Sequence, residues 1–429
     1  MNRIDRIKEL IMFAMVKEYR IHIEEERTAE LFFVRDRLDM RRIKDVTRYR
    51  VTVFRTEERD GQKLKASAEV ILNESMLGGD GVKALRDAYY AAQFAMNPYY
   101  EAADPVQSEL VLKATRLAAL TPEEAAVMTA KQLFSANDVE GAFINSAEVF
   151  AVQTENRIVT SSGTDVSWTD AKITGEYVVQ AKEPEDVEMY KHFGMSELDE
   201  AGFTASVREA LTFVRDRAHA ERILRSGSYD LILSGENVAE VLNYFAARSA
   251  AAMIYPHYST WQVGDDVQGE TAGERLSLTL LADAPFSNEG VPMTDRALIE
   301  DGRLKLIHGA TRFCRYLGVE PTGDYRRFAC GNEGSMSFEE MKKTPCLWAV
   351  TFSDFQMDPF SGHFGGEIRL AYLIDENGVT PVTGGSVNGS LLEAEKDIAF
   401  STDRFTSENY SGPYAMKLRG IAIAGSNEE

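Results

Sequence analysis

The chain has 429 residues, of which 44% are hydrophobic and 27% charged, and its formal net charge at pH 7 is −21. This composition is typical of a globular protein of two or three domains and excludes a disordered chain. The negative charge argues against nucleic acid or an anionic membrane surface as the main partner. The cysteines Cys314, Cys330 and Cys346 are evenly spaced without a CxxC pair, so they predict neither a disulfide framework nor a structural zinc site.

The first twenty residues combine basic side chains with an apolar centre. Lys8, Glu9 and Lys17 interrupt the apolar stretch, and no small-residue cleavage site follows it, which disfavours a secretion signal. Uninterrupted apolar runs also stay well short of the roughly 20 residues that span a bilayer. We therefore expect a cytoplasmic protein.

The first 225 residues predict a mixture of helices and strands. The first helix should bury one face, made by Ile4, Ile7, Ile11, Ala14 and Met15. A second helix is expected over residues 82–96. Between them the expected strands are residues 19–24, 31–34, 49–54 and 64–72, the last introduced by a hairpin turn at Asp60-Gly61.

A linker over residues 98–110 separates this part from the next helix. Thr121, Pro122 and Glu124 form a capping-box signature, so a helix should begin there and run to about Phe134. The elements expected after it are strands at 142–153, 157–161 and 173–181, a polar turn at 160–165, and a helix at 205–224.

Residues 231–255 read as a buried strand, a Ser234-Gly235 turn and a helix with apolar residues at helical spacing. This arrangement is typical of a catalytic strand and helix, yet it lacks a His, a Cys or paired carboxylates at the expected positions. The preceding Arg225–Ser228 stretch is the best candidate domain boundary. We therefore predict an N-terminal α/β domain at 1–225, on the substrate cavity side, and a β-rich C-terminal domain at 226–429.

Strand patterns dominate the second half. The expected strands are residues 276–281, 297–300, 304–308, 347–352, 367–374 and 420–424. Asp301-Gly302 and Asn377-Gly378 predict hairpin turns, and short helices are expected at 338–342 and 391–395. The predicted fold class is α+β.

Familiar catalytic motifs are missing. The six histidines are scattered, so the two-His spacing of a helical zinc site does not occur. A G-x-S-x-G elbow is absent, and Gly385–Gly389 reads as a turn. Neither a Walker A loop nor a G-x-G-x-x-G motif follows a strand, so nothing favours a nucleotide enzyme.

Two aromatic and polar stretches are candidate contact surfaces, one at residues 352–367 and the other at 255–261. The candidate peptide or partner contacts in them are Asp354, Asp358, His363, Phe364, Glu367, His257 and Trp261. The alternative is that the first stretch is a glycine-bearing turn with core aromatics, and that the second fills the domain junction.

The chain resembles the TldD/PmbA family, once described as modulators of DNA gyrase and now regarded as zinc-dependent peptidases. The resemblance covers roughly residues 140–425. It is carried by the order and spacing of the segments at 148–168, 231–255, 288–309, 316–328 and 418–425. It implies an α/β N-terminal domain, a β-rich C-terminal domain, and dimers around an enclosed cavity.

Catalytic members of the family carry HExxxH on the helix after the strand at residue 231, and a later Cys ligand. On this chain the motif positions fall on Asn243, Tyr244 and Arg248, and the Cys-bearing turn resembles Gly384-Gly385-Ser386. Asn, Tyr and Arg cannot replace His, Glu and His as a zinc shell. We therefore assign no catalytic or metal residue and no cofactor, and the chain looks like the PmbA/TldE-like branch.

The leading hypothesis is a metal-free partner subunit of a TldD-like zinc peptidase that acts on unfolded or extended peptides. A second hypothesis is a peptidase with its own site around Asp354, Asp358, His363 and Glu367. A third is a homodimeric peptide-binding protein without hydrolytic activity. A gyrase or DNA-binding role finds little support in so acidic a chain.

Overall fold

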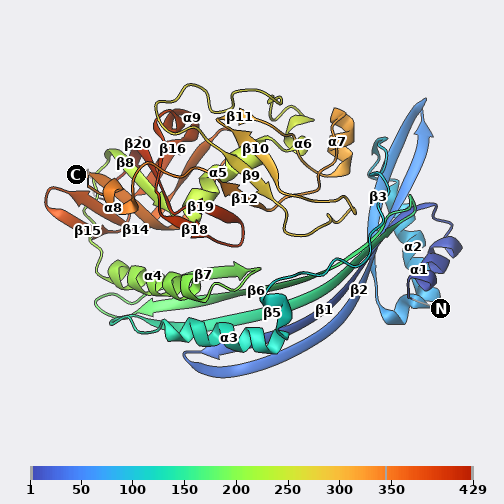
Figure 1. Ribbon diagram of the computed structural model, residues 1–429, viewed down its shortest axis with the longest axis horizontal. Coiled ribbons are helices and arrows are strands. Elements are labelled where there is room, and N and C mark those ends of the chain that lie inside the picture. The colour runs from blue at the N-terminus through green and yellow to red at the C-terminus, as the bar shows by residue number, and fades with distance from the viewer. Residues whose placement is uncertain (1–2, 344, 427–429) are drawn as a thin grey trace.

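A computed structural model describes residues 3–343 and 345–426 of the chain. Its first part is a long curved sheet of seven strands in the order β4-β3-β2-β1-β5-β6-β7, which sweeps across the lower half of Figure 1. The strands are β1 (Glu18–Val34), β2 (Arg37–Arg59), β3 (Gln62–Leu72), β4 (Asn97–Pro98), β5 (Phe143–Thr160), β6 (Asp165–Ala181) and β7 (Val187–Met195).

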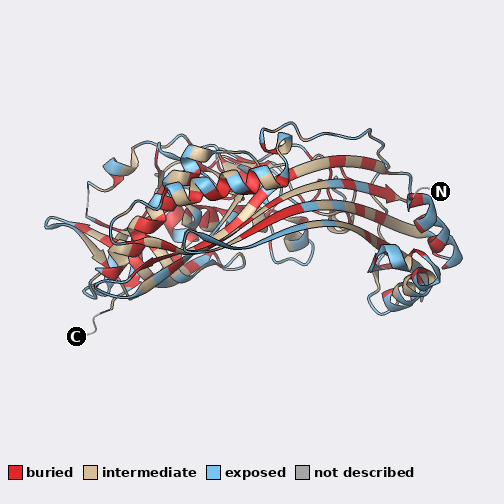
Figure 2. Ribbon diagram, turned by 90° about the horizontal axis from the view of Figure 1, so that it is seen from below, coloured by how far each residue is buried: buried red, intermediate tan, exposed pale blue. Residues whose placement is uncertain are grey.

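The helices of the first part cover the two ends of this sheet. Helices α1 (Arg3–Phe13) and α2 (Gly79–Ala92), with the short turn η1 (Glu74–Leu77), pack at one end, where the strands bury Ile21, Tyr49 and Val51. Helices α3 (Pro122–Ser135), preceded by η2 (Leu117–Ala119), and α4 (Glu200–Ala218) pack toward the other end. In Figure 2 the buried residues form bands across these long strands.

The second part contains two more sheets. One has six strands in the order β11-β10-β9-β12-β19-β18. They are β9 (Leu278–Leu281), β10 (Arg296–Glu300), β11 (Arg303–Leu304), β12 (Arg327–Cys330), β18 (Arg404–Thr406) and β19 (Tyr410–Pro413).

The other sheet has the order β13-β8-β20-β16-β14-β15, with β17 on β20, and β13 also pairs with β14. This extra pairing closes five of its strands into a ring. The strands are β8 (Gly227–Ser234), β13 (Cys346–Met357), β14 (His363–Asp375), β15 (Gly378–Val382), β16 (Ser386–Ser390), β17 (Ala399–Phe400) and β20 (Ala415–Ala424). The helices of this part lie in the connections between its strands: α5 (Glu236–Arg248), α6 (Ala251–Ile254), α7 (Thr311–Leu317), α8 (Phe338–Met341), α9 (Leu391–Ala394) and η3 (Glu395–Asp397).

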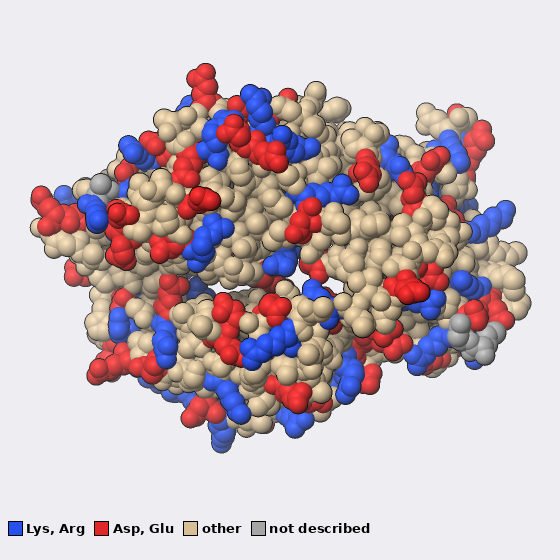
Figure 3. Space-filling model, viewed as in Figure 1, with Lys and Arg blue, Asp and Glu red and all other residues tan. Residues whose placement is uncertain are grey.

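A hydrophobic core joins the two parts. Val207, Leu211 and Val214 of α4 belong to the same cluster as Leu370 and Tyr372 of β14. The two parts also meet where Trp168 of β6 packs against Phe286 and where Arg20 of β1 pairs with Glu289. Between these contacts Figure 3 shows openings that are flanked by charged side chains. The mixture of helices and β-rich parts confirms the α+β class.

Several predicted elements are confirmed and several are wrong. The hairpin turns at Asp60-Gly61, Asp301-Gly302 and Asn377-Gly378 connect β2 to β3, β10 to β11 and β14 to β15. The Thr121 capping box is present, with Glu124 bonded back to Thr121. Met15, however, is exposed with a positive φ of 61° just after α1, because the helix ends at Phe13.

The glycine-rich stretch Gly385–Gly389 is not simply a turn. Gly384 and Gly385 do turn, with φ values of 83° and 82°, but Ser386 begins β16. The stretch continues as a strand because Ser386 pairs with Glu367 of β14 on one side and with Ala424 of β20 on the other. None of the helices in the described part of the chain is long and apolar enough to cross a membrane.

Candidate functional site

The strand and the helix predicted within residues 231–255 form, but the helix ends at Arg248 and a separate short helix, α6, covers Ala251–Ile254. β8 lies between β13 and β20, and Leu231 and Leu233 face the core that also contains α5. Gly235 joins strand to helix with a φ of 59°, a conformation that favours glycine. Val238, Val241, Leu242 and Phe245 are buried, so the apolar face of α5 packs against the sheet.

The three motif positions on α5 differ in environment. Asn243 is exposed, whereas the Tyr244 ring is buried and meets Trp261 edge to face at 5.9 Å between ring centroids. Burial raises the pKa of Tyr244 above its usual value, and the nearby Arg248 offsets only part of the shift. Tyr244 therefore stays protonated at neutral pH and cannot act as a general base there.

Arg248 connects three segments. Its Nη1 donates to the carbonyl oxygens of Tyr258 at 2.7 Å and Phe360 at 3.3 Å. Its guanidinium carbon lies 5.8 Å from the ring centroid of Tyr244 and 5.5 Å from that of Trp261. Arg248 thus ties the end of α5 to the 255–261 loop and to the turn between β13 and β14. We call Tyr244, Arg248, Tyr258, Trp261 and Phe360 the Arg248 cluster.

The 255–261 loop supplies aromatic packing to this cluster. Trp261 stacks on Phe245, and Tyr258 meets the Phe360 ring edge to face at 5.3 Å. Tyr258 and Phe360 are both exposed on their outer sides. His257 is exposed with a φ of 64°, so it turns the loop and lies outside the ring contacts.

The predicted residues between 352 and 367 do not meet at one point. Asp354 accepts a hydrogen bond from Gln356, and Glu367 accepts from Ser353 and pairs with Arg369 at 3.2 Å. Each carboxylate therefore has a local partner on its own hairpin.

The turn itself holds Asp358 and His363. Hydrogen bonds from Ser361 and from the Phe360 backbone lower the pKa of Asp358, and exposed His363 lies close enough to contribute. Phe364 is buried against Gly389 of β16, so its side chain is part of the core and is not available as a surface contact.

Glu395 is a buried carboxyl with a raised pKa that the sequence did not lead us to expect. It is only 6% exposed, and its Oε2 has no hydrogen-bond partner. Burial, followed by the charge of Asp266, raises its pKa to about 8. Its charge also contributes to raising the pKa of Tyr244 on α5. The spacing of Leu391, Ala394 and Ile398 is the signal that could have placed it on a buried face.

Metal-ligating groups are not assembled here. In residues 3–343 and 345–426, no group of three or more His, Cys, Asp or Glu side chains could hold a metal ion. The three cysteines are buried and unpaired. Burial raises the pKa of Cys314 to about 11 and that of Cys330 to about 12, and it also raises that of Cys346, so all three stay thiols.

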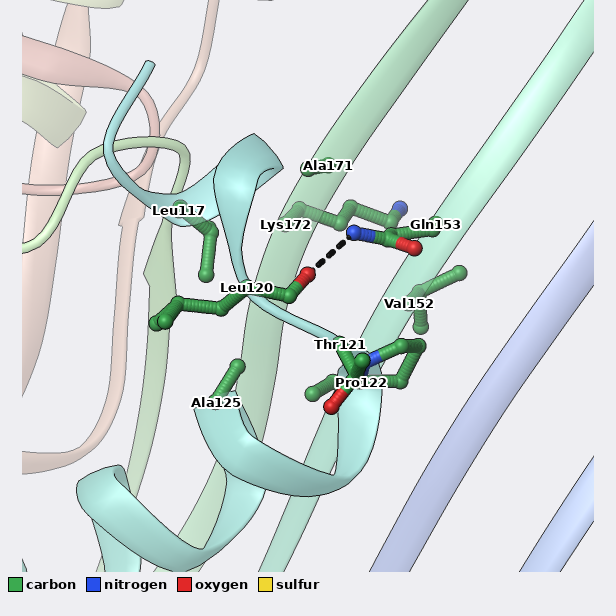
Figure 4. A pocket seen from close by; sticks show the side chains of 10 residues that line it. Leu117, Leu120, Thr121, Pro122, Ala125, Val152, Gln153, Ala171 and Lys172 are labelled. Carbon is green, nitrogen blue, oxygen red and sulfur yellow. Dashed lines mark hydrogen bonds between the residues drawn. The ribbon is translucent and has the colours of Figure 1, made fainter.

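Two recesses lie outside the Arg248 cluster. The smaller, shown in Figure 4, has no room for a water molecule; there Gln153 donates to the Leu120 carbonyl at 2.6 Å and fixes the start of α3. The larger, of about 440 Å³ and open to solvent, lies between the two parts of the chain. Its buried Lys65 pairs with Glu18, and its Glu289 accepts two hydrogen bonds from Thr311, so its charges are internally satisfied.

Known proteins share both this fold and part of this sequence. Residues 226–425 match the PmbA/TldA metallopeptidase C-terminal domain. A metalloprotease TldD homologue from Haemophilus influenzae is 27% identical over 37% of this chain, and the match spans 38% of that relative's length.

Solved structures cover nearly the whole chain. TldE from Thermococcus kodakarensis superposes with a TM-score of 0.77 at 16% identity, over 98% of this chain and 100% of that chain. A proposed modulator of a DNA gyrase from Thermotoga maritima gives 0.74 at 18% identity, over 98% and 99% of the two chains. At these identities the likeness shows the fold alone.

The chain is therefore an α+β protein with the fold of TldE and a metallopeptidase-type C-terminal domain. Its C-terminal part, residues 226–425, matches the C-terminal domain of the TldD/PmbA family, in agreement with the resemblance of the sequence to that family.

Proposed function

We propose that this chain is a metal-free partner subunit of a TldD-like zinc peptidase that acts on unfolded or extended peptides. The observation that carries the proposal is the setting of Arg248. At the position where the family resemblance expects the second zinc histidine, the guanidinium is held by two carbonyl oxygens and lies near two aromatic rings.

The chemistry of the three motif residues supports this function. Arg248 is a permanent cation that would repel a divalent metal. Tyr244 is buried and protonated, and Asn243 is a neutral amide on the exposed side of α5. Without a metal at this position, no bound water is activated and no oxyanion is stabilised by a Lewis acid.

In such a complex this chain would form part of the peptide-binding surface and would supply no catalytic group. Its strand-rich architecture suits an extended peptide, which can add main-chain hydrogen bonds to a strand while aromatic side chains contact its residues. The other subunit of the complex is a TldD-like catalytic chain or a second copy of this chain. We expect the complex to form in the cytoplasm.

Co-expression with an HExxxH-bearing homologue from the same genome tests this proposal. We expect a stable complex on gel filtration, and peptidase activity that depends on the presence of both chains. Failure to form a complex, or the same peptidase activity without this chain, would overturn the proposal.

A triple substitution provides a second test. Asn243→His, Tyr244→Glu and Arg248→His restore the motif, yet the Cys position in the Gly384-Gly385-Ser386 turn has no ligand. We therefore expect no zinc-dependent hydrolysis from the triple variant alone. Measurable hydrolysis that a chelator abolishes would show that this interpretation of α5 is wrong.

A further inference from the structure

The two parts of the chain meet at two principal contacts, and the first is a packed hydrophobic core. Val207 and Leu211 of α4 share this core with Tyr372 of β14. The Phe213 ring of α4 also meets the Trp348 ring of β13 edge to face, at 5.8 Å between ring centroids. We call this contact of α4 with β13 and β14 the anchor.

The second contact joins the other end of the long sheet to the loop between β9 and β10. Phe286 of this loop meets Trp168 of β6 at 5.9 Å between ring centroids. Glu289 of the same loop pairs with Arg20 of β1 at 3.5 Å. The second part therefore reaches the sheet here with one aromatic ring and one ion pair.

Helix α7 extends this second contact to the linker at residues 98–110. The Tyr316 hydroxyl donates to the Pro98 carbonyl at 2.5 Å, and Arg315 pairs with Asp104 at 3.1 Å. We call the contacts of the β9–β10 loop and of α7 with the first part the clasp. In Figure 1 α7 lies at the right beside β3, whereas α4 lies at the left, so the clasp and the anchor are at opposite ends.

The clasp is a weaker contact than the anchor. Among the described residues its buried apolar cluster consists of Ile158, Val166, Trp168 and Phe286, and of these Phe286 alone comes from the second part. The Asp104 side chain is 93% exposed, and exposed ion pairs contribute little to stability. The recess of about 440 Å³ that is open to solvent also interrupts this contact. Small, polar contacts between domains permit relative motion.

The chain crosses from the first part to the second at the anchor. It leaves α4 at Ala218 and enters β8 at Gly227. Between them Glu221 is tied to β15, because its N–H donates to the Pro381 carbonyl at 3.0 Å. No covalent link crosses the clasp, since the linker at residues 98–110 belongs entirely to the first part. A rotation about the anchor therefore separates the clasp without stretching the chain.

We infer that the molecule opens as a hinge, in which the anchor stays packed and the clasp separates. Between the two contacts the Glu408 side chain lies against Gly194 of β7, and this single side chain moves away with the second part. The openings in Figure 3 then join into one cleft that is accessible from the clasp side. The inference does not depend on the proposed function, so either can fail alone.

Distances between spin labels test the hinge on the full chain. Labels at Ser162→Cys and Glu320→Cys lie on exposed sites on either side of the clasp, and labels at His219→Cys and Glu376→Cys span the anchor. The wild-type chain, whose three cysteines are buried, measures background labelling. Each labelled variant is diluted with unlabelled chain, so that double electron–electron resonance reports distances within one molecule. We expect a short and a longer distance across the clasp, and one narrow distance across the anchor.

Weakening the clasp should increase the open population. Arg20→Gln with Arg315→Gln removes two ion pairs across the clasp, and it should raise the long-distance fraction about twofold to fivefold. Arg208→Gln is the matched control, because it removes a pair with Asp138 inside the first part and should leave both distances unchanged.

Two outcomes overturn the inference. One narrow distance across the clasp, in the wild type and in the double variant alike, would show that the two parts form one rigid body. Equal broadening across the clasp and the anchor would show that the parts separate without a hinge at the anchor.

Discussion

Replacing Glu395 with Gln should remove most of the loss of folding stability that this carboxyl causes as the pH rises. Glu395 is 6% exposed, and its Oε2 lacks a hydrogen-bond partner. Burial and, to a smaller extent, the charge of Asp266 raise its pKa from 4.5 to about 8, and Lys396 offsets only part of the effect. The folded protein therefore holds this proton more tightly than the unfolded chain does.

The sign of the pH dependence follows from this raised pKa. Below about pH 4.5 the carboxyl is protonated in both states, so it costs no stability. As the pH rises from 4.5 toward 8, the unfolded chain ionises while the folded chain does not, and stability falls. At about 1.36 kcal/mol per pKa unit, the expected loss between about pH 5.5 and about pH 8.5 is about 3 kcal/mol.

Urea denaturation at pH values between these two limits measures this loss. Glu395→Gln should flatten the fall in unfolding free energy relative to the wild type, because the amide does not ionise. Glu393→Gln, on an exposed neighbour in the same segment, should keep the wild-type slope. The amide of Gln also adds a hydrogen-bond donor, whose effect on the unfolding free energy is the same at every pH. The informative quantity is therefore the slope of the unfolding free energy against pH. Equal slopes for Glu395→Gln and the wild type would refute the reasoning.

Three further substitutions probe local features, each measured as a urea unfolding free energy. Thr121→Ala removes the capping box of α3 and should cost about 1 kcal/mol, and Thr121→Ser should restore most of it. Gly389→Ala places a Cβ 2.3 Å from the Phe364 ring and should cost about 2 kcal/mol, a loss that Phe364→Leu in the same chain should reduce. Glu30→Gln should cost about 2 kcal/mol at neutral pH. Burial raises the pKa of Glu30, but Lys44 and Arg42 of β2 outweigh that effect and lower the pKa overall. The stability that Glu30 contributes is therefore present above pH 4.5 and should be lost as the pH falls through the lowered pKa.

Local signals in the sequence predicted the fold most accurately. The turn at Asp60-Gly61 and the capping box at Thr121 depend on neighbouring residues, and both formed as expected. The length of β1 did not follow from local pattern, because the sequence predicted two strands, at residues 19–24 and 31–34, where the structure has one strand over Glu18–Val34. Cross-strand pairing explains the continuous strand: Arg48 of β2 lies 2.7 Å from both Glu24 and Glu26.

The candidate site was predictable only in part for a similar reason. The position and apolar face of α5 followed from helical periodicity. The contacts of Arg248 with Tyr258 and Phe360 join residues 10 and 112 positions away, and no local rule predicts such contacts. Glu395 and Glu393 are the same residue type two positions apart, and only tertiary packing buries the first and exposes the second.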